Sequence, residues 1–189
     1  MNKFLASKFY SRLILILTII FILSVSNLVK FAYPLKYQDF INKYSKEYNI
    51  DPYIIISIIN CESRFNKDAK SNKAAYGLMQ IKDTTAVWAA NQMGIRDFKL
   101  SSLYDPETNI KIGCWYINSL NSEFKGNTDS ILAAYNAGIG NVTKWLQDSN
   151  NSKNGKDLYY IPYKETDKYV KKVKTDYTIY KMLYSKVAN

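Results

Sequence analysis

An acidic residue, Glu62, interrupts the apolar face of a predicted helix over residues 52–65. At about 100° per residue, it falls on the same side of that helix as Ile55, Ile58 and Phe65. The carboxyl is therefore expected to face the core, where burial raises its pKa by disfavouring the charged form. A raised pKa suits a general acid near neutral pH. The alternative is a structural glutamate, held by Lys, Arg or backbone donors or reaching solvent at a frayed helix end.

The composition excludes several other catalytic schemes. The 189 residues include no histidine, which removes Ser-His-Asp and Cys-His nucleophiles and most zinc sites. We predict no metal site and no cofactor, so carboxylates, amides and tyrosines must carry any chemistry. The two cysteines, Cys61 and Cys114, are predicted to form a free buried pair. A disulfide formed after export is the alternative.

The charge balance is strongly basic, with a formal net charge of +10. Such a surplus favours anionic partners, including nucleic acid, phospholipid surfaces and acidic polymers. The lysines are spread along the chain without a run of five or more, however, and there is no zinc-finger spacing or nucleic-acid motif. We therefore expect a lysine-rich solvated surface and no nucleic-acid partner.

The first 32 residues differ in composition from the rest of the chain. They open with three basic residues, Lys3, Lys8 and Arg12. The uncharged stretch that follows, Leu13 to Val29, makes roughly 25 Å of helix, at the short end for a bilayer core of about 30 Å. We predict that residues 1–32 are a cytoplasmic tip and a single-pass anchor in the cell membrane, with the rest of the chain outside the cytoplasm. The alternative is a cleaved signal segment, which secretes the domain.

Residues 33–189 are predicted to form one mainly α-helical domain with at most a very small sheet, preceded by the N-terminal hydrophobic helix. The expected helices span about 35–48, 52–65, 83–93, 106–124, 129–137 and 167–187. Asp51-Pro52 and Asp105-Pro106 are typical helix starts, and Gly94 and Gly138 are typical ends. Polar residues 148–157 predict a surface loop.

The last predicted helix has a narrow apolar stripe with lysines on its other faces. The stripe consists of Val170, Val173, Tyr177, Tyr180, Tyr184 and Val187.

Four short blocks include or follow Glu62. They are Glu62-Ser63-Arg64-Phe65-Asn66; Gly77-Leu78-Met79-Gln80-Ile81; Ala133-Ala134-Tyr135-Asn136-Ala137-Gly138 with Gly140-Asn141-Val142; and Ile161-Pro162-Tyr163 with Glu165-Thr166 and Tyr169-Val170. A weaker fifth is Leu103-Tyr104-Asp105-Pro106 with Asn109-Ile110 and Gly113. In order and spacing, these blocks resemble the catalytic domain of soluble lytic transglycosylases over about residues 40–185. That family has a goose-lysozyme-like fold and acts on peptidoglycan.

The resemblance implies that Glu62 is a single acid and base. It would protonate the oxygen between N-acetylmuramic acid and N-acetylglucosamine, then take the proton of the muramic acid C6 hydroxyl and close a 1,6-anhydro ring without water. The implied partner is the peptidoglycan glycan strand. The implied substrate-binding residues are Ser63, Met79, Gln80, Tyr135, Asn136 and Glu165.

Two other functions remain open. A hydrolase of the goose-lysozyme type shares the fold and the acid but releases a reducing end, and Asp68 or Asp83 would have to position the water. The second is a non-catalytic glycan-binding module in a larger envelope machine, which would keep the groove and could lose the acid.

Overall fold

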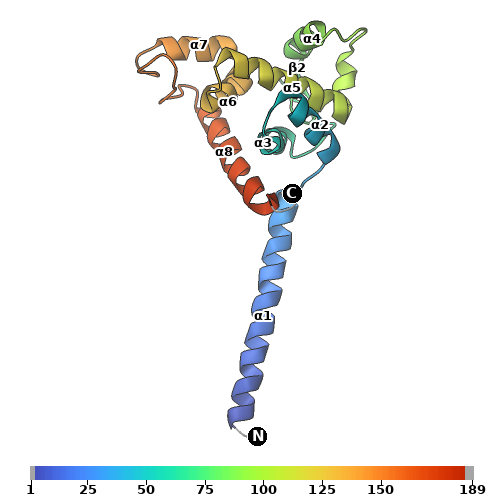
Figure 1. Cartoon of the computed structure of the whole chain (residues 1–189), viewed down its shortest axis with the longest axis vertical. Helices are drawn as coiled ribbons and strands as arrows, with labels where there is room; N and C mark the ends of the chain where they lie inside the picture. The colour runs from blue at the N-terminus through green and yellow to red at the C-terminus, as the bar shows by residue number, and fades with distance from the viewer. Residues whose placement is uncertain (1–2, 186–189) are drawn as a thin grey trace. The chain divides into compact units, whose positions relative to one another are not determined.

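The computed structural model describes residues 3–185, which are mainly helical (Figure 1). The chain divides into two units between Pro34 and Leu35, close to the boundary predicted at residue 32. The first unit contains one helix, α1, Lys3–Ala32. The predicted fold class, a mainly α domain with a very small sheet after one N-terminal hydrophobic helix, is confirmed.

In the part of the chain that the structure describes, no helix is both long and apolar enough to cross a membrane. The predicted transmembrane anchor in residues 1–32 is therefore not supported. A signal segment at this end stays a prediction.

The second unit consists of packed helices and one two-stranded antiparallel sheet. Its elements are α2 (Gln38–Tyr48), α3 (Pro52–Ser63), β1 (Ala75–Tyr76), β2 (Ile81–Lys82), α4 (Asp83–Gln92), the 3-10 helix η1 (Leu100–Tyr104), α5 (Pro106–Glu123), α6 (Thr128–Ala137), α7 (Ile139–Gln147) and α8 (Lys164–Tyr184). Every predicted helix is present within a few residues, whereas η1 and α7 were not predicted. Val187, which the sequence assigned to the last helix, lies outside the described residues.

The predicted helix starts have the expected cap geometry. Asp51 accepts a hydrogen bond from the Tyr53 backbone N–H at 2.9 Å, and Asp105 accepts one from Thr108 at 2.8 Å. In both cases proline occupies the first helical position, where its missing N–H costs nothing. These caps set where α3 and α5 begin. The first residue of each helix in turn determines which of its side chains face the core.

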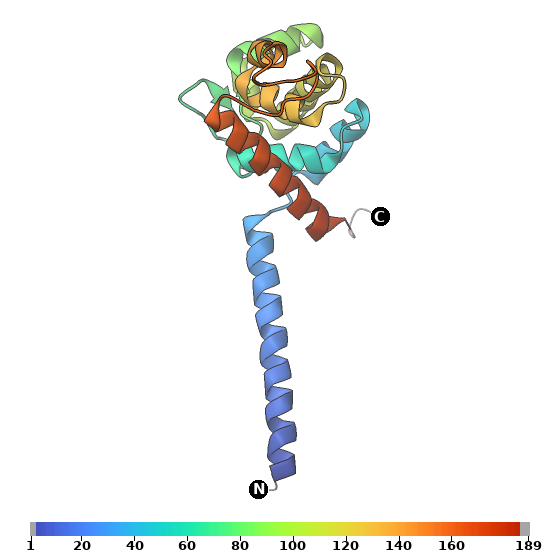
Figure 2. The ribbon, with the colours of Figure 1, turned by 90° about the vertical axis from the view of Figure 1, so that its left-hand side faces the viewer.

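Helix α3 packs along α8, α2 along α5, and α6 against both α5 and α8 (Figures 1 and 2). Side chains from α3, α5, α6 and α8 fill the core, among them Ile55, Ile58, Ile59, Ile110, Leu120, Leu132, Val173 and Tyr180. Helix α3 is buried over most of its length. Its last turn therefore lies where the core meets the surface of the domain.

Helix α8 buries more than its predicted stripe. Val170, Val173 and Tyr180 are buried as expected, while Tyr177 and Tyr184 are only half-buried. Its buried surface also includes the polar residues Thr166, Tyr169 and Asp176. The face of α8 that meets the core is thus wider and more polar than the apolar spacing suggested.

The cysteines form no disulfide. Cys61 and Cys114 are both free, as predicted, and Cys114 is buried. Cys61 is only partly buried, so the prediction of a buried pair holds for one of the two thiols.

Candidate active site

Glu62 lies in the last turn of α3, at the point where the helix ends. After Ser63, Arg64 and Phe65 have left-handed backbone, at φ of 50° and 62°. Residues other than glycine rarely adopt this conformation. Phe65 is buried, which fixes the chain in this turn. The abrupt end leaves Glu62 half-buried, in the wall of a pocket.

The pocket has a volume of about 220 Å³. Its lining comes from α3, the segment before and after β1, β2, α4, α5, α6 and α8. The lining residues are Glu62, Ser71, Lys73, Ala75, Gln80, Ile81, Lys82, Thr85, Tyr116, Tyr135, Asn136, Gly138 and Glu165. Residues far apart in the sequence therefore surround a single carboxyl.

One wall of the pocket is the turn between β1 and β2. The side chain of Asn109 on α5 fixes this turn by hydrogen bonds. The fully buried Asn109 amide accepts from the Met79 backbone N–H at 2.8 Å and donates to the carbonyls of Tyr76 and Leu103. Gly77 has φ of 73°, and a Cβ there would collide with the Asn109 side chain and the Leu103 carbonyl. Glycine is thus required for this close approach.

Gln80, at the end of the same turn, lines the pocket. Its amide donates to the carbonyls of Ala69 at 3.1 Å and Gly77 at 3.0 Å, and these contacts support its own left-handed backbone at φ 47°. Its side-chain oxygen is an acceptor that these two bonds leave unused.

The opposite wall is the C-terminal end of α6. The Tyr135 hydroxyl donates to the Met79 carbonyl at 2.8 Å, which joins the two walls. Asn136 accepts a hydrogen bond from the Thr166 hydroxyl of α8 at 2.8 Å, so its NH₂ group is left to donate elsewhere. Burial keeps the pKa of Tyr135 well above its ordinary value, and the phenol therefore stays protonated at neutral pH.

The pKa of Glu62 is raised from 4.5 to about 7, chiefly because burial disfavours the carboxylate. The Glu165 charge adds to this rise. A hydrogen bond from Tyr169 and the charges of Lys172 and Lys82 act in the opposite direction. Desolvation exceeds these stabilising influences, so about half of the Glu62 carboxyls keep their proton at pH 7.

Tyr169 faces Glu62 from α8 without lining the pocket. It is buried, and its hydroxyl has no hydrogen bond of standard geometry among the described residues. Its hydroxyl nevertheless opposes the rise in the Glu62 pKa that burial causes.

The structure brings five of the predicted site residues together in the pocket lining. They are Glu62, Gln80, Tyr135, Asn136 and Glu165. Ser63 and Met79 do not reach it. The Ser63 hydroxyl donates to the Leu78 carbonyl at 2.7 Å, and the Met79 side chain is fully buried against Gly113.

Glu165 occupies an exposed position at the start of α8, with 72% of its side chain accessible. It forms an ion pair with Lys73 across the pocket at 3.3 Å. The two other acids considered from the sequence lie elsewhere: Asp68 pairs with Lys67, and Asp83 accepts a hydrogen bond from the Thr84 backbone N–H. Neither Asp68 nor Asp83 lines the pocket.

Sequence reasoning missed several residues that surround Glu62, namely Ser71, Lys73, Lys82, Thr85, Tyr116 and Tyr169. A signal existed only for Tyr169, which precedes Val170 in one of the sequence blocks and lies four residues before Val173 on the same helical face. The others lie in loops or on helix faces whose neighbours no periodicity predicts.

Comparison with known proteins identifies related domains. Residues 39–158 match the Transglycosylase SLT domain family. The soluble lytic murein transglycosylase of Salmonella typhimurium is 36% identical over 143 residues, which cover 75% of this chain and 22% of that protein. The membrane-bound lytic murein transglycosylase C of Serratia proteamaculans is 34% identical over 118 residues, 58% of this chain and 33% of that protein. The chain thus spans a third or less of the length of these relatives.

Solved structures agree with the family match. The lytic transglycosylase Slt of Pseudomonas aeruginosa, determined as an inactive mutant, has 31% identity and a TM-score of 0.71 over 79% of this chain and 24% of that one. The 70-kDa soluble lytic transglycosylase in complex with bulgecin A has 34% identity and a TM-score of 0.72 over 79% and 25%. The second unit therefore has the lysozyme-like fold that the sequence resemblance predicted.

Proposed function

This chain belongs to the Transglycosylase SLT domain family, and from that premise we propose that it cleaves peptidoglycan glycan strands without water, using Glu62 as acid and then as base. The observation that carries the proposal is the half-buried Glu62 carboxyl, with a pKa of about 7, in the wall of a pocket. Near neutral pH such a group is protonated in about half of the molecules.

In the first step, protonated Glu62 gives its proton to the oxygen that joins N-acetylmuramic acid to N-acetylglucosamine. The bond from that oxygen to C1 of the muramic acid breaks, and the sugar acquires oxocarbenium character. The N-acetylglucosamine side leaves with the proton, and Glu62 becomes a carboxylate. Tyr169, Lys172 and Lys82 each stabilise this charged form of Glu62.

In the second step, the ionised Glu62 takes the proton of the muramic acid C6 hydroxyl. The C6 oxygen bonds to C1 and closes the 1,6-anhydro ring, which restores protonated Glu62. No water enters the products, and the same carboxyl serves both steps.

The distribution of carboxylates supports this chemistry over hydrolysis. A retaining glycosidase places two carboxyl groups about 5–5.5 Å apart, and an inverting enzyme about 6.5–9.5 Å apart. Glu165 is the second carboxylate that lines the pocket, and it is largely exposed and paired with Lys73. This pairing disfavours it as nucleophile or base, although a goose-type hydrolase remains the alternative function.

We propose that Gln80, Asn136, Tyr135 and Glu165 bind the sugars. The Gln80 oxygen and the Asn136 NH₂ group suit the acetamido group and hydroxyls of an amino sugar. Ser63 and Met79 would support binding indirectly, because both hold the turn that carries Gln80. Since peptidoglycan lies outside the cytoplasmic membrane, the domain would act there.

The test is mass spectrometry of soluble fragments from purified peptidoglycan incubated with the full chain or with Glu62→Gln. Anhydro-muramyl products from the unmodified chain alone are expected. Reducing-end products would make the protein a hydrolase. If neither folded protein released fragments, a non-catalytic glycan-binding module would be the better description.

A further inference from the structure

Helices α3 and α8 meet beneath the pocket in an antiparallel register. The Asn60 amide donates to the Asp176 carboxylate at 2.8 Å in a buried contact, and two residues further along α3, Glu62 interacts with Tyr169. Residues later in α3 therefore lie beside residues earlier in α8, as expected for antiparallel helices. Lys172 lies between these two contacts on α8, three residues from Tyr169 and four from Asp176, and neighbours at these spacings share a helix face.

The Lys172 side chain is directed toward α3. Burial raises the pKa of the Cys61 thiol, and the Lys172 charge acts against that rise. Cys61 directly precedes Glu62. Asn60 of α3 thus contacts Asp176, and the next two residues, Cys61 and Glu62, are influenced electrostatically by Lys172 and Tyr169. A positive charge is thereby placed within one residue of the proposed acid.

Asp176 holds that ammonium in place. The Lys172 Nζ lies 3.3 Å from the same Asp176 oxygen that accepts from Asn60. Only 5% of the Asp176 side chain is accessible, against 48% for Lys172. A buried carboxylate is costly unless it is both paired and hydrogen-bonded, so the Asp176 charge favours the inward position of Lys172 over full solvation.

Lys172 influences Glu62 from α8, although it is not among the described residues that line the pocket. The other titratable groups that interact with Glu62 or lie beside it are Tyr135 of α6, Glu165 and Tyr169 of α8, Lys82 of β2 and Cys61 of α3. Of the lysines around Glu62, Lys73 and Lys82 line the pocket, with Lys73 paired to Glu165, whereas Lys172 is tied to a buried anion.

We propose that Lys172, held by Asp176 and Asn60, is a positioning residue that stabilises the ionised form of Glu62 between its acid and base steps, a role that rests on the function proposed above. A glutamate used twice must release its proton readily and then accept another. A fixed cation at one side favours the release. Because Asp176 shares that cation, Lys172 does not form a full ion pair with Glu62, which would make the carboxylate too weak a base.

The test is the pH profile of glycan-strand cleavage by the full chain, compared with Lys172→Gln. Glutamine can still bond to Asp176 but carries no charge. Activity declines at alkaline pH as Glu62 loses its proton, and we expect this alkaline limb to move up by about one pH unit in the variant, because an opposite charge nearby lowers a carboxyl pKa by about that much. Lys172→Arg is expected to restore the original limb.

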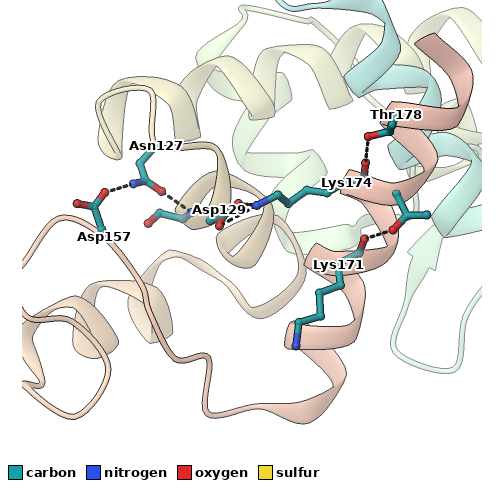
Figure 3. Close-up of polar contacts among 8 residues, drawn as sticks. Asn127, Asp129, Asp157, Lys171, Lys174 and Thr178 are labelled. Atoms are coloured by element: carbon teal, nitrogen blue, oxygen red, sulfur yellow. Dashed lines mark hydrogen bonds and ion pairs between the residues drawn. The ribbon is translucent and has the colours of Figure 1, made fainter. Parts of the chain in front are cut away.

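Lys174→Gln is the matched control. It lies on the same helix, and its ammonium pairs with Asp129 rather than with a group near Glu62 (Figure 3). The control should leave the alkaline limb where it is. Should Lys172→Gln fail to fold, Lys172→Met keeps the apolar stem of the lysine and is expected to give the same shift.

Direct titration of the Glu62 carboxyl by carbon NMR separates this inference from the proposed function. An upward shift in Lys172→Gln relative to the unmodified chain and Lys174→Gln would support the electrostatic role even if no cleavage were seen, in which case the proposed function alone would fail. An unchanged titration in a folded Lys172→Gln variant would overturn the role of Lys172.

Discussion

Two of the Lys–Asp pairs formed by helix α8, Lys174–Asp129 and Lys172–Asp176, differ in burial, and the closer of these two is the more exposed. Lys174 approaches Asp129 of α6 to 2.6 Å, with 52% and 40% of the two side chains accessible. Lys172 lies 3.3 Å from Asp176, which is almost wholly enclosed. An exposed pair gains little, because water and salt screen the attraction and two long side chains must be ordered. A buried carboxylate without its partners is costly.

The two pairs also differ in the residues that surround them. Figure 3 shows Lys174 reaching Asp129 near Asn127, which caps α6 and also donates at 2.6 Å to Asp157 of the loop between α7 and α8. These contacts join surface elements. The Lys172–Asp176 pair instead adjoins Asn60 and Cys61, next to Glu62. Burial and neighbours, more than the distance between charges, decide which pair influences the pocket.

The largest difference is expected from removing the two aspartates. Asp176→Ala leaves the Asn60 amide without its acceptor inside the domain and should lower the free energy of unfolding by about 3 kcal/mol. Asp129→Ala should lower it by less than about 1 kcal/mol. Urea unfolding of the full chain measures both. Equal losses would mean that burial does not distinguish the two pairs.

The pH dependence of stability should reveal Glu62 itself. Its folded-state pKa of about 7 lies above the ordinary 4.5, so between these values the folded protein holds a proton that the unfolded chain releases. Stability is therefore greatest below pH 4.5 as far as this group is concerned, and it falls as the pH rises to 7, by at most roughly 3 kcal/mol. Urea unfolding at several pH values should show this slope reduced in Glu62→Gln. An identical slope in both proteins would contradict the raised pKa.

Removing the hydroxyl of Tyr135 or of Tyr169 is expected to have smaller effects, which differ between the two residues. Tyr135→Phe deletes the donor to the Met79 carbonyl and should cost about 1 kcal/mol of unfolding free energy. Tyr169→Phe deletes a buried hydroxyl without a well-formed bond and should cost less, while the alkaline limb of activity moves up because the donor to Glu62 is lost. Thermal unfolding and a pH–activity profile of each variant distinguish the two. A larger stability loss for Tyr169→Phe would reverse the assignment.

The smallest effect is expected at the exposed pair. Lys174→Met should change the free energy of unfolding by no more than about 0.5 kcal/mol, and added salt should remove most of that change. Urea unfolding at low and high ionic strength provides the measurement. A loss that persisted in high salt would show that this contact contributes more than a surface ion pair.

Much of the fold could be predicted because its signals are local. Asp51-Pro52 and Asp105-Pro106 set helix starts through contacts within three residues. The phase of α3 followed from the spacing of its isoleucines, and that phase directed Glu62 to the core side. The small helix α7 escaped prediction because Gly138 ends one helix and begins the next, so a signal interpreted as a stop was also a start.

The residues around Glu62 could be predicted only in part. Gln80, Tyr135, Asn136 and Glu165 lie in blocks that the family resemblance marked, and all four line the pocket. Asp176 and Lys172 lie in no such block. On a helical wheel they are two of many charged residues on a lysine-rich helix, and an apolar stripe gives no reason to bury either. Ser63 and Met79 were marked by sequence, yet they support the turn from inside.

The sequence by itself determined the helical class, the helix caps and the placement of one carboxyl on an apolar face, because each depends on residues within about one helical turn of each other. Only the tertiary structure decided how buried Glu62 is, which phenol faces it, and which lysine of α8 adjoins it. Those properties depend on the register between α3 and α8, where contacts such as that of Asn60 with Asp176 join residues 116 apart in the sequence. A pKa depends on this three-dimensional environment, and no spacing along the chain specifies it.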